Sequence, residues 1–375
     1  MTVDVCMVGN TLSYVEGSGQ LWIHLNWALS LLDAGVDLTW VEFVEDDAEP
    51  ADTTARVDAL TRRLEVFGLA DRLRLASNLA LPPGPAAARA IRREEFAEAD
   101  LMLSFCYWFP SEWVKAARAA AIVDIDPGLL QIWMADGDMV VAPHDHYFTI
   151  GETVGTPEAR FPDGGVDWTY TPPPVHLPSW PVVAAPMSGA YTTVSHWWED
   201  GWVCFDGEEY QNDKRVSFLD FVEVPKLAGV PVELATNLTD GDADDRVLLE
   251  ANAWRLRDSA SVSRTPTDYR HYIQESRGEF SCAKPSCMKL QNAWVSDRTI
   301  CYLATGRPAI VQHTGPSRVL PDAAGILRFT SPAEAAAALQ RAEADYDFHA
   351  REARALAEHT FDGNIVVRSI LERCL

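Results

Sequence analysis

The amino-acid sequence predicts an α/β fold made of two doubly wound units, and three observations lead to this prediction. The chain opens with a β-rich run, a glycine loop, a helix and a second strand, an order typical of a parallel sheet. A segment dense in proline and glycine, residues 151–181, then interrupts the alternation. Strands and helices alternate again from residue 190 onward, and 375 residues suffice for two domains of ordinary size.

The first unit is predicted to contain a parallel sheet with helices around it. After the opening strand, helical spacing begins at Leu21 and stops at Gly35, a residue type that commonly follows a helix C-terminus. A β-rich run and a second amphipathic helix come next, and three further apolar runs have the length of buried strands. The expected strands cover residues 3–8, 36–44, 99–108, 120–126 and 146–151, and the expected helices cover residues 21–35 and 55–73.

The second unit repeats this pattern after the proline-rich connection. We expect a first domain over residues 1–178 and a second over residues 182–355, each of the Rossmann-like type. The expected strands are residues 190–198, 230–238 and 308–312. The expected helices are residues 214–229, 244–256, 266–277, 297–305, 331–361 and 364–374.

The composition limits the partners of the chain. Its 55 acidic residues outnumber 31 basic ones and give a formal net charge of −24, which repels nucleic-acid backbones and anionic membranes. Seven cysteines without a Cys-x-x-Cys pair indicate neither a disulfide framework nor a structural zinc. The N-terminus lacks the basic lead of a signal peptide, and no stretch reaches the length of a membrane helix. We therefore expect a cytoplasmic protein that binds no nucleic acid and has no integral membrane segment.

The segment SDRTICYLATGRPAIVQHTG places charged residues at the start of an apolar helix and a glycine after the next strand. Ser296 is a good N-cap, and Asp297 lies in the first turn, where the helix dipole favours an acid. Thr314 and Gly315 follow the strand, and open α/β sheets bind ligands beyond the carboxyl ends of their strands. Such an acid can accept hydrogen bonds from a ribose diol, while Arg298 can pair with phosphate. Alternatively, Ser296 and Asp297 only cap the helix, and Arg298 is solvated.

The preceding segment, ESRGEFSCAKPS, brings a second group of polar residues close in sequence. Arg277, Glu279, Ser281 and Lys284 surround Gly278, where we expect a turn. With the charged start of the following helix they would form one polar cluster from two consecutive loops. Because apolar runs flank the group on both sides, the sequence favours a ligand site over a scattered charged surface.

These motifs resemble the donor-binding half of glycosyltransferases with the GT-B fold. In the second half, the resemblance is carried by EFSCAK, WVSDRTICYLATGRPAIVQHTG and LPDAAGILRFTSPAEAAAAL. It extends to EGSGQLWIHLNWALSLLDAG, DIDPG, HDHYFTIGETVGTP and HAREARALAEHTFD, so it spans nearly the whole chain. It implies two Rossmann-like domains that face a cleft, with the nucleotide sugar in the C-terminal domain. It also implies that a final helical segment, residues 356–375, crosses back to the N-terminal domain.

The resemblance also implies roles for single residues. Glu279 and Ser281 would lie near the donor sugar and diphosphate. Asp297 would lie near the ribose, and Thr314-Gly315 beside the phosphates.

Positive side chains are expected to neutralise the diphosphate. We expect Arg277 and Lys284 to do so, with Lys214 either a further phosphate contact or a solvated lysine. The resemblance implies that no metal or other cofactor is needed, because positive side chains and helix dipoles neutralise the leaving diphosphate of the co-substrate, a nucleotide sugar such as a UDP-sugar. Retaining members often carry Glu-x7-Glu here, but Cys287 stands eight residues after Glu279, so the stereochemistry stays open.

The glycine loop after the first strand, Gly17-Ser18-Gly19, can approach a ligand closely. A dinucleotide fingerprint requires a third glycine three positions on, where Trp22 stands, although Glu42 ends the second strand where a ribose-binding acid would lie. An NAD-dependent oxidoreductase is therefore one alternative. In a GT-B protein the loop faces acceptor and sugar, and Glu16 is then either a candidate base or a solvated acid.

Two other acids are candidates for the catalytic base. Asp126 comes at the end of a buried strand, before Pro127-Gly128, and is expected to open into the cleft. There it could take a proton from the acceptor, or it could only cap the loop. Asp145 is a second candidate; it lies between two histidines for which no third metal ligand is visible. Glu152 is expected to line the hinge.

We therefore expect a glycosyltransferase that moves a sugar from a nucleoside-diphosphate sugar to a small soluble acceptor, such as a natural-product intermediate. The alternatives are the oxidoreductase, a non-catalytic GT-B protein that binds a nucleotide, and a related epimerase. Monomer and homodimer are both compatible with the sequence. Most of the 13 tryptophans are expected in the core.

Overall fold

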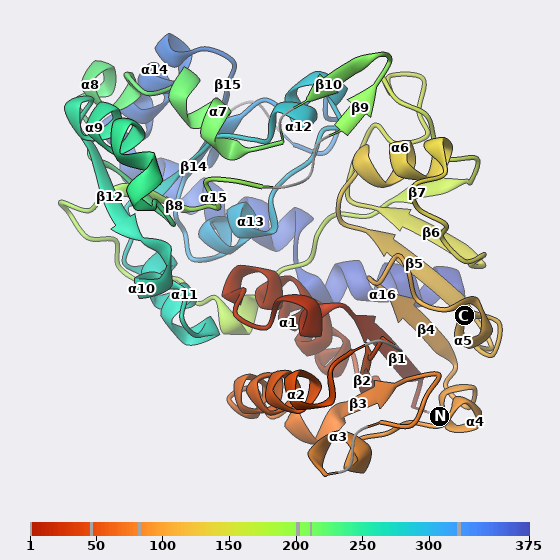
Figure 1. Ribbon diagram of the computed structural model, residues 1–375. Coiled ribbons are helices and arrows are strands. Elements are labelled where there is room, and N and C mark those ends of the chain that lie inside the picture. Colours follow the sequence, from red (N-terminus) through yellow and green to blue (C-terminus); the bar gives the residue numbers. More distant parts are fainter. Residues whose placement is uncertain (1, 46–47, 82–83, 200–202, 211, 321–323) are drawn as a thin grey trace.

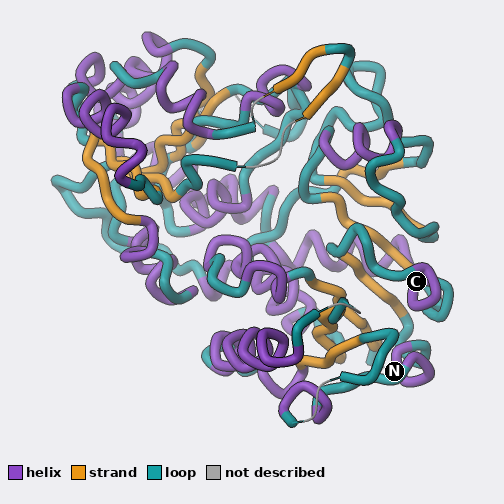
Figure 2. The backbone as a smooth tube through the Cα atoms, viewed as in Figure 1, coloured by secondary structure: helices purple, strands orange, loops and turns teal. Residues whose placement is uncertain are grey.

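The computed structural model describes residues 2–45, 48–81, 84–199, 203–210, 212–320 and 324–375. Its strands form two larger sheets, of seven and six strands, with helices around each (Figure 1). Figure 2 shows these strands as two separate groups, each surrounded by helices and loops. The predicted α/β fold with two doubly wound units is confirmed.

The first sheet has the strand order β3-β2-β1-β4-β5-β6-β7, and all neighbouring strands are parallel. This is the order of a doubly wound nucleotide-binding fold with one more strand at its edge. The strands are β1 (Asp4–Gly9), β2 (Asp37–Phe43), β3 (Leu73–Ala76), β4 (Leu101–Ser104), β5 (Ala120–Asp124), β6 (His146–Thr149) and β7 (Trp168–Tyr170). The helices are η1 (Thr11–Tyr14), α1 (Ser18–Asp33), α2 (Pro50–Glu65), η2 (Ala70–Arg72), α3 (Pro85–Ala88), α4 (Arg93–Phe96), α5 (Ser111–Val114), α6 (Leu129–Asp136) and η3 (Leu177–Ser179).

The second sheet, β12-β11-β8-β13-β14-β15, is also parallel and repeats the same order, counted from its own first strand. Its strands are β8 (Tyr191–Val194), β11 (Val232–Thr236), β12 (Trp254–Asp258), β13 (Gly278–Ser281), β14 (Ala309–Gln312) and β15 (Ile326–Phe329); β9 (Val203–Phe205) and β10 (Glu208–Tyr210) form a hairpin. The helices are α7 (Lys214–Asp220), α8 (Val224–Ala228), η4 (Asp240–Asp242), α9 (Ala243–Ala251), α10 (Ser259–Val262), α11 (Pro266–Gln274), α12 (Pro285–Leu290), α13 (Asp297–Ala304), α14 (Pro332–Ala344), α15 (Tyr346–Thr360) and α16 (Gly363–Cys374).

Several local predictions were wrong. The turn expected at Gly278 is the start of β13, a fully buried strand in the middle of the second sheet. The helix expected to reach residue 256 ends at Ala251, because Ala253 has a positive φ of 67° and β12 begins at Trp254. The helices expected at 214–229 and 331–361 each divide in two, and β3, β7 and β15 were not predicted.

The C-terminal helix crosses back to the first unit, as predicted (Figure 1). Val175 donates a backbone hydrogen bond to Phe361 (2.7 Å), and Gly363 donates one to Val175 (2.9 Å). A Cβ on Gly363 would meet Ser30 Oγ at 1.9 Å, so only glycine allows α16 to lie this close to α1. The two units are therefore joined by packed helices as well as by the chain connection.

Candidate active site

A cavity of about 660 Å³ lies between the carboxyl ends of the two sheets. The loops after β1 and β5 form one wall, and the loop after β8 and the starts of α7 and α13 form the other. In both sheets the strand order reverses beside β1 or β8, and ligands of open α/β sheets bind at such a switch point. The cavity has the size of a site for a small organic ligand.

Two lysines from the second unit line this cavity. Lys214, the first residue of α7, forms no ion pair within the part of the chain that the structure describes, and its ammonium lies 5.9 Å from the centre of the Trp294 ring. Burial lowers the pKa of Lys214 to about 7, helped by the charges of Arg298 and Lys284. The lysine was expected either at phosphate or in solvent, and the structure places it in the cavity.

Lys284 lies before α12 and contacts the carboxylate of Glu199 at 2.9 Å. Burial tends to lower its pKa, but the charges of Asp126 and Glu199 outweigh burial and raise the pKa of Lys284 overall. Lys284 therefore carries a positive charge at neutral pH. The two lysines place positive charge on the wall of the cavity that the second unit forms, and an anionic ligand of a strongly acidic protein needs such a charge.

Four acids line the same cavity: Glu16, Glu199, Asp126 after β5 and Asp297 at the start of α13. Burial, with a smaller contribution from the charge of Asp126, raises the pKa of Asp297 to about 7. Burial also raises the pKa of Asp126, which the Lys284 charge lowers and the Glu199 charge raises. The backbone N–H of Asp126 donates a hydrogen bond to Asp124 Oδ1 (2.9 Å). The side chain of Asp126 has no hydrogen-bond partner among the described residues. Asp126 is therefore free to contact a ligand.

Arg298 lines the cavity but is held on all sides by the second unit. Its Nε lies 2.8 Å from Glu279 Oε1, and its two terminal nitrogens donate to Val194 O (2.7 Å) and Ser281 Oγ (2.5 Å). The alternative of a solvated Arg298 is therefore wrong. The arginine ties α13 to β8 and β13, and Glu279 and Ser281 serve it as partners.

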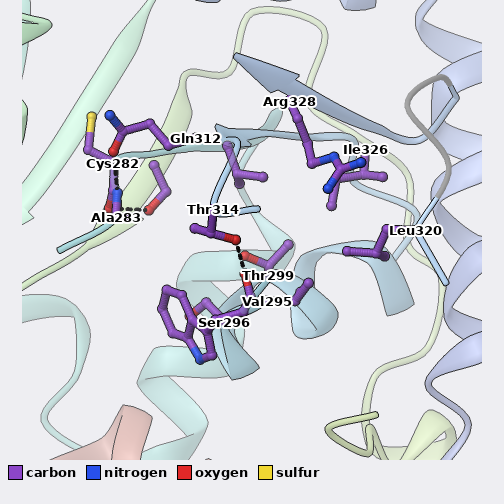
Figure 3. Close-up of a pocket in the computed structure, with 13 residues that line it drawn as sticks. Cys282, Ala283, Val295, Ser296, Thr299, Gln312, Thr314, Leu320, Ile326 and Arg328 are labelled. Carbon is purple, nitrogen blue, oxygen red and sulfur yellow. Dashed lines mark hydrogen bonds between the residues drawn. The ribbon is translucent and has the colours of Figure 1, made fainter. Parts of the chain in front are cut away.

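Ser296 caps α13 as predicted, with Oγ accepting a hydrogen bond from Arg298 N (3.3 Å). Thr314 lines a separate small cavity beside β13 and β14 (Figure 3). Its Oγ1 donates to Trp294 O (2.6 Å), and its carbonyl accepts from Ala293 N (3.1 Å). Gly315 has a φ of 148°, and a Cβ there would meet Gln291 O at 2.4 Å. Thr314-Gly315 thus supports the turn before α13.

Two predicted site residues lie away from the cavity. Arg277 precedes β13, where it pairs with Glu343 (2.9 Å) and lies over the Tyr346 ring, 3.3 Å from its centre. Asp145 precedes β6 and accepts a hydrogen bond from Ala120 N (2.9 Å). Because both residues precede parallel strands, they lie at the opposite edge of each sheet from the cavity. Neither prediction holds for this cavity: Arg277 is not placed to contact a diphosphate there, and Asp145 is not placed to act there as a base.

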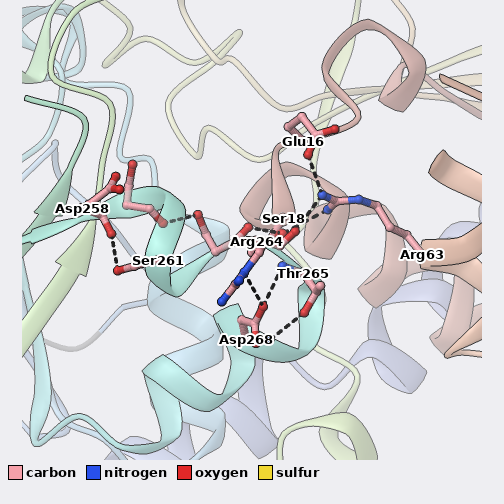
Figure 4. A network of polar contacts seen from close by, with 10 residues as sticks. Glu16, Ser18, Arg63, Asp258, Ser261, Arg264, Thr265 and Asp268 are labelled. Atoms are coloured by element: carbon pink, nitrogen blue, oxygen red, sulfur yellow. Dashed lines mark hydrogen bonds and ion pairs between the residues drawn. The ribbon is translucent and has the colours of Figure 1, made fainter. Parts of the chain in front are cut away.

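The first glycine loop lines the cavity and also contacts the second unit (Figure 4). Glu16, whose side chain is 80% exposed, pairs with Arg63 at 3.1 Å. Arg63 also donates to Ser18 Oγ (3.1 Å) and to Arg264 O (2.8 Å). Gly19 lies so close to Tyr269 that a Cβ would be 3.4 Å from its ring. The Gly17-Ser18-Gly19 loop is thus part of a bridge between the two units.

These contacts remove the support for a dinucleotide in the first unit. Ser18 Oγ donates to Ser263 O, and Trp22 Nε1 donates to Pro266 O (2.8 Å), so residues 263–266 cover the loop that would hold a pyrophosphate. Glu42 is buried and accepts hydrogen bonds from Thr11 Oγ1, Leu12 N and Trp40 Nε1. Its carboxylate is used within the fold and is not presented to a ribose.

Several cavity residues were not proposed as site residues from the sequence. Tyr14, His196, Trp198 and Glu199 line the cavity mouth, and the rings of Tyr14 and His196 are 5.7 Å apart. His196, Trp198 and Glu199 belong to the SHWWED segment, whose tryptophans were expected in the core, and no sequence signal singled out Tyr14. Glu152 is buried and accepts a hydrogen bond from Arg318 N (2.6 Å), which agrees with its expected place between the units.

Over the described ranges, no group of three or more histidines, cysteines or acids is arranged to hold a metal ion. A search of the same ranges for a helix with the length and apolar character of a membrane span finds none.

Comparison with known proteins shows which solved structures have a similar fold. The chain matches no protein-family model, and a search of curated proteins gives no match. Among solved structures, it is similar to a glycosyltransferase from Rickettsia africae ESF-5, with a TM-score of 0.56, 11% identity and coverage of 99% and 97% of the two chains. It is similar to Anabaena Alr3699/HepE in complex with UDP-glucose (TM-score 0.56, 11% identity, coverage of 99% and 98%). An alpha-glucosyltransferase in complex with UDP and a 13-mer DNA gives a TM-score of 0.60 at 8% identity, with 99% of both chains covered.

These similarities extend over nearly the full length of each chain, so they concern the arrangement of both units and not one of them alone. The strand orders of the two sheets and the returning C-terminal helix agree with that arrangement. The chain therefore has the GT-B fold of these solved glycosyltransferases, two Rossmann-like units that face one cavity.

Proposed function

We propose that the protein transfers a glycosyl group from a nucleoside-diphosphate sugar to an acceptor hydroxyl. The observation that carries this proposal is the pair of partly buried lysines, Lys214 and Lys284, that line the cavity at the carboxyl edge of the second sheet. Lys214 forms no ion pair among the described residues and faces a cavity between the two units. The fold adds support, because the solved structures with this fold include glycosyltransferases in complex with UDP or UDP-glucose.

The proposed donor site lies against the second unit. The diphosphate contacts Lys214 and Lys284, and the N-terminus of α13 adds a favourable dipole for negative charge. Asp297, in the first turn of α13, accepts hydrogen bonds from the ribose hydroxyls. Glu199 leaves Lys284 when the more highly charged diphosphate arrives.

The proposed acceptor site lies against the first unit, where Asp126 faces the cavity. A bond forms between the acceptor oxygen and the anomeric carbon, and the bond from that carbon to the diphosphate oxygen breaks. The electron pair leaves with the diphosphate, whose charge the two lysines stabilise. The hydroxyl proton passes to the Asp126 carboxylate. Glu16 is a less suitable base because Arg63 already pairs with it.

A small soluble acceptor remains our preferred class, and the net charge of −24 disfavours a nucleic acid. One similar structure, the alpha-glucosyltransferase, holds DNA, so a duplex DNA is a useful negative control in an acceptor screen.

Binding of UDP tests the donor site directly. We expect calorimetry to detect UDP binding to the wild-type chain, and Lys214→Ala to weaken it by about 10- to 100-fold, the contribution of one charge-assisted contact. Lys226→Ala, which removes an exposed lysine from α8, is the matched control and should leave the affinity unchanged. The donor site would be refuted by equal UDP affinity in both variants. The alternative of a non-catalytic nucleotide-binding protein predicts the same UDP binding and the same effect of Lys214→Ala. It predicts neither hydrolysis nor transfer of the sugar from any nucleotide-sugar donor.

A further inference from the structure

A second cavity, of about 280 Å³, opens beside the proposed active site along the same edge of the first sheet. The two cavities share Asn10, the residue after β1. The η1 turn separates them, with Tyr14 lining the active-site cavity and Leu12 lining the second one. Because β2, β1 and β4 are neighbours in the sheet, the second cavity lies over their carboxyl ends, next to the β5 end that carries Asp126.

An aromatic side chain and a carboxylate in this cavity are not used by the fold. Trp108 is 40% exposed, and no ring contact or hydrogen bond of its side chain occurs among the described residues. Glu45 is exposed, and no partner of its carboxylate occurs among the described residues. The indole and the carboxylate line the same cavity, and an aromatic face together with a negative charge favours an organic cation.

The other charged groups in the cavity are already paired. Arg56 lies 2.8 Å from Asp52 and donates a hydrogen bond to Leu12 O (3.0 Å). Glu42 accepts hydrogen bonds from Thr11, Leu12 and Trp40, as described above. Glu45 is therefore the carboxylate that remains for a ligand.

The electrostatic surroundings agree with this assignment. Cys106 lines the cavity, and burial raises the pKa of its thiol, with the charges of Glu42 and Glu45 raising it further. The carboxylates of Glu42, Glu45 and Asp52 line the cavity against the single guanidinium of Arg56, and this balance favours a cation over an anion.

We propose that this second cavity binds a protonated amine of the acceptor, with the ammonium group between the Trp108 ring and the Glu45 carboxylate. The acceptor then extends past Asn10, so that one of its hydroxyls reaches Asp126. This inference rests on the proposed function, and it narrows the acceptor class to amine-bearing compounds such as amino sugars or aminocyclitols.

Binding of an amine-rich probe tests the proposal. We expect kanamycin to bind the UDP-saturated protein in calorimetry at neutral pH, and its fully N-acetylated form to bind much more weakly. Glu45→Gln and Trp108→Leu should each lower the kanamycin affinity by about three- to fivefold. Glu65→Gln removes an equal charge from the exposed end of α2 and should have no effect, which controls for general attraction to an acidic protein.

Two outcomes would overturn the inference. One is equal binding of kanamycin and its N-acetylated form. The other is an equal response of the Glu45→Gln and Glu65→Gln variants. In either case, UDP affinity and its dependence on Lys214 would be unaffected, so failure of the amine site is distinguishable from failure of the proposed function. Unchanged circular dichroism and UDP affinity of the Trp108→Leu variant would show that its fold is intact.

Discussion

Arg298 and Glu279 form an ion pair of 2.8 Å between Nε and Oε1, in which the Glu279 side chain is fully buried. The pair joins the start of α13 to β13, the strand beside β8 in the middle of the second sheet. Glu279 Oε2 has no hydrogen-bond partner of its own within the described ranges. The position of Asp297, and of the helix N-terminus in the cavity, therefore depends on this pair.

Loss of Arg298 should destabilise the protein. Arg298→Met leaves the Glu279 charge buried and unpaired, so we expect the free energy of unfolding to fall by about 3–5 kcal/mol in urea titrations. The double variant Glu279→Gln/Arg298→Met should recover most of that loss, because no buried charge remains. Equal stability of the single and double variants would show that the pair is not the cause.

The affinity for UDP should depend on pH through Lys214. Its pKa of about 7 in the free protein means that the ammonium is lost as the pH rises through that value. UDP affinity should therefore fall between about pH 7 and about pH 9, above the range where phosphate itself ionises. Asp297 ionises near the same pH, so the variant that isolates the lysine is Lys214→Arg. Its permanent charge should flatten the profile; an unaltered slope would exclude Lys214 as the cause.

Removal of the proposed base should affect turnover more than donor binding. Asp126→Asn should reduce kcat by about 10²- to 10⁴-fold, with UDP affinity changed little, because the amide cannot accept the proton. Asp145→Asn, at the opposite edge of the sheet, should keep near wild-type activity. Transfer assays on both variants with one donor and one acceptor provide the comparison, and equal rates would remove Asp126 from the mechanism.

In the proposed donor site, Glu199 would compete with the diphosphate for Lys284, because the Lys284 ammonium and the Glu199 carboxylate are 2.9 Å apart. Glu199→Gln should therefore strengthen UDP binding by a few-fold, about the worth of a partly exposed ion pair. Weaker binding to this variant in calorimetry would mean that Glu199 itself holds the ligand or orders Lys284.

Gly315 supports the turn that leads into α13. Gly315→Ala should lower both stability and UDP affinity, because the new methyl group would meet the backbone of Gln291 and Ala293. Gly207 also has a positive φ, but open space surrounds it, so Gly207→Ala introduces backbone strain without a clash. This control variant should keep the wild-type UDP affinity. Equal effects of the two changes would argue against a positioning role of Gly315.

The sequence by itself determined the fold class, the helix caps and part of the site. Helical and strand periods, Gly35 and Ser296 are local signals, because they depend on backbone geometry and on neighbours a few residues away. The segments that carry Asp126, Lys284 and Asp297 could be recognised for the same reason, since strand ends and helix starts are local features.

The tertiary structure alone decided which charged residues face the cavity between the two units. Arg277 and Lys284 are seven positions apart and equally basic, yet one lies before β13 and the other after it, so they occupy opposite edges of the sheet. Lys214 and Arg298 were each expected at a phosphate or in solvent, yet distant elements leave Lys214 without a carboxylate among the described residues and pair Arg298 with Glu279. Pairing and burial depend on residues far apart in the chain, and local sequence patterns contain no information about them.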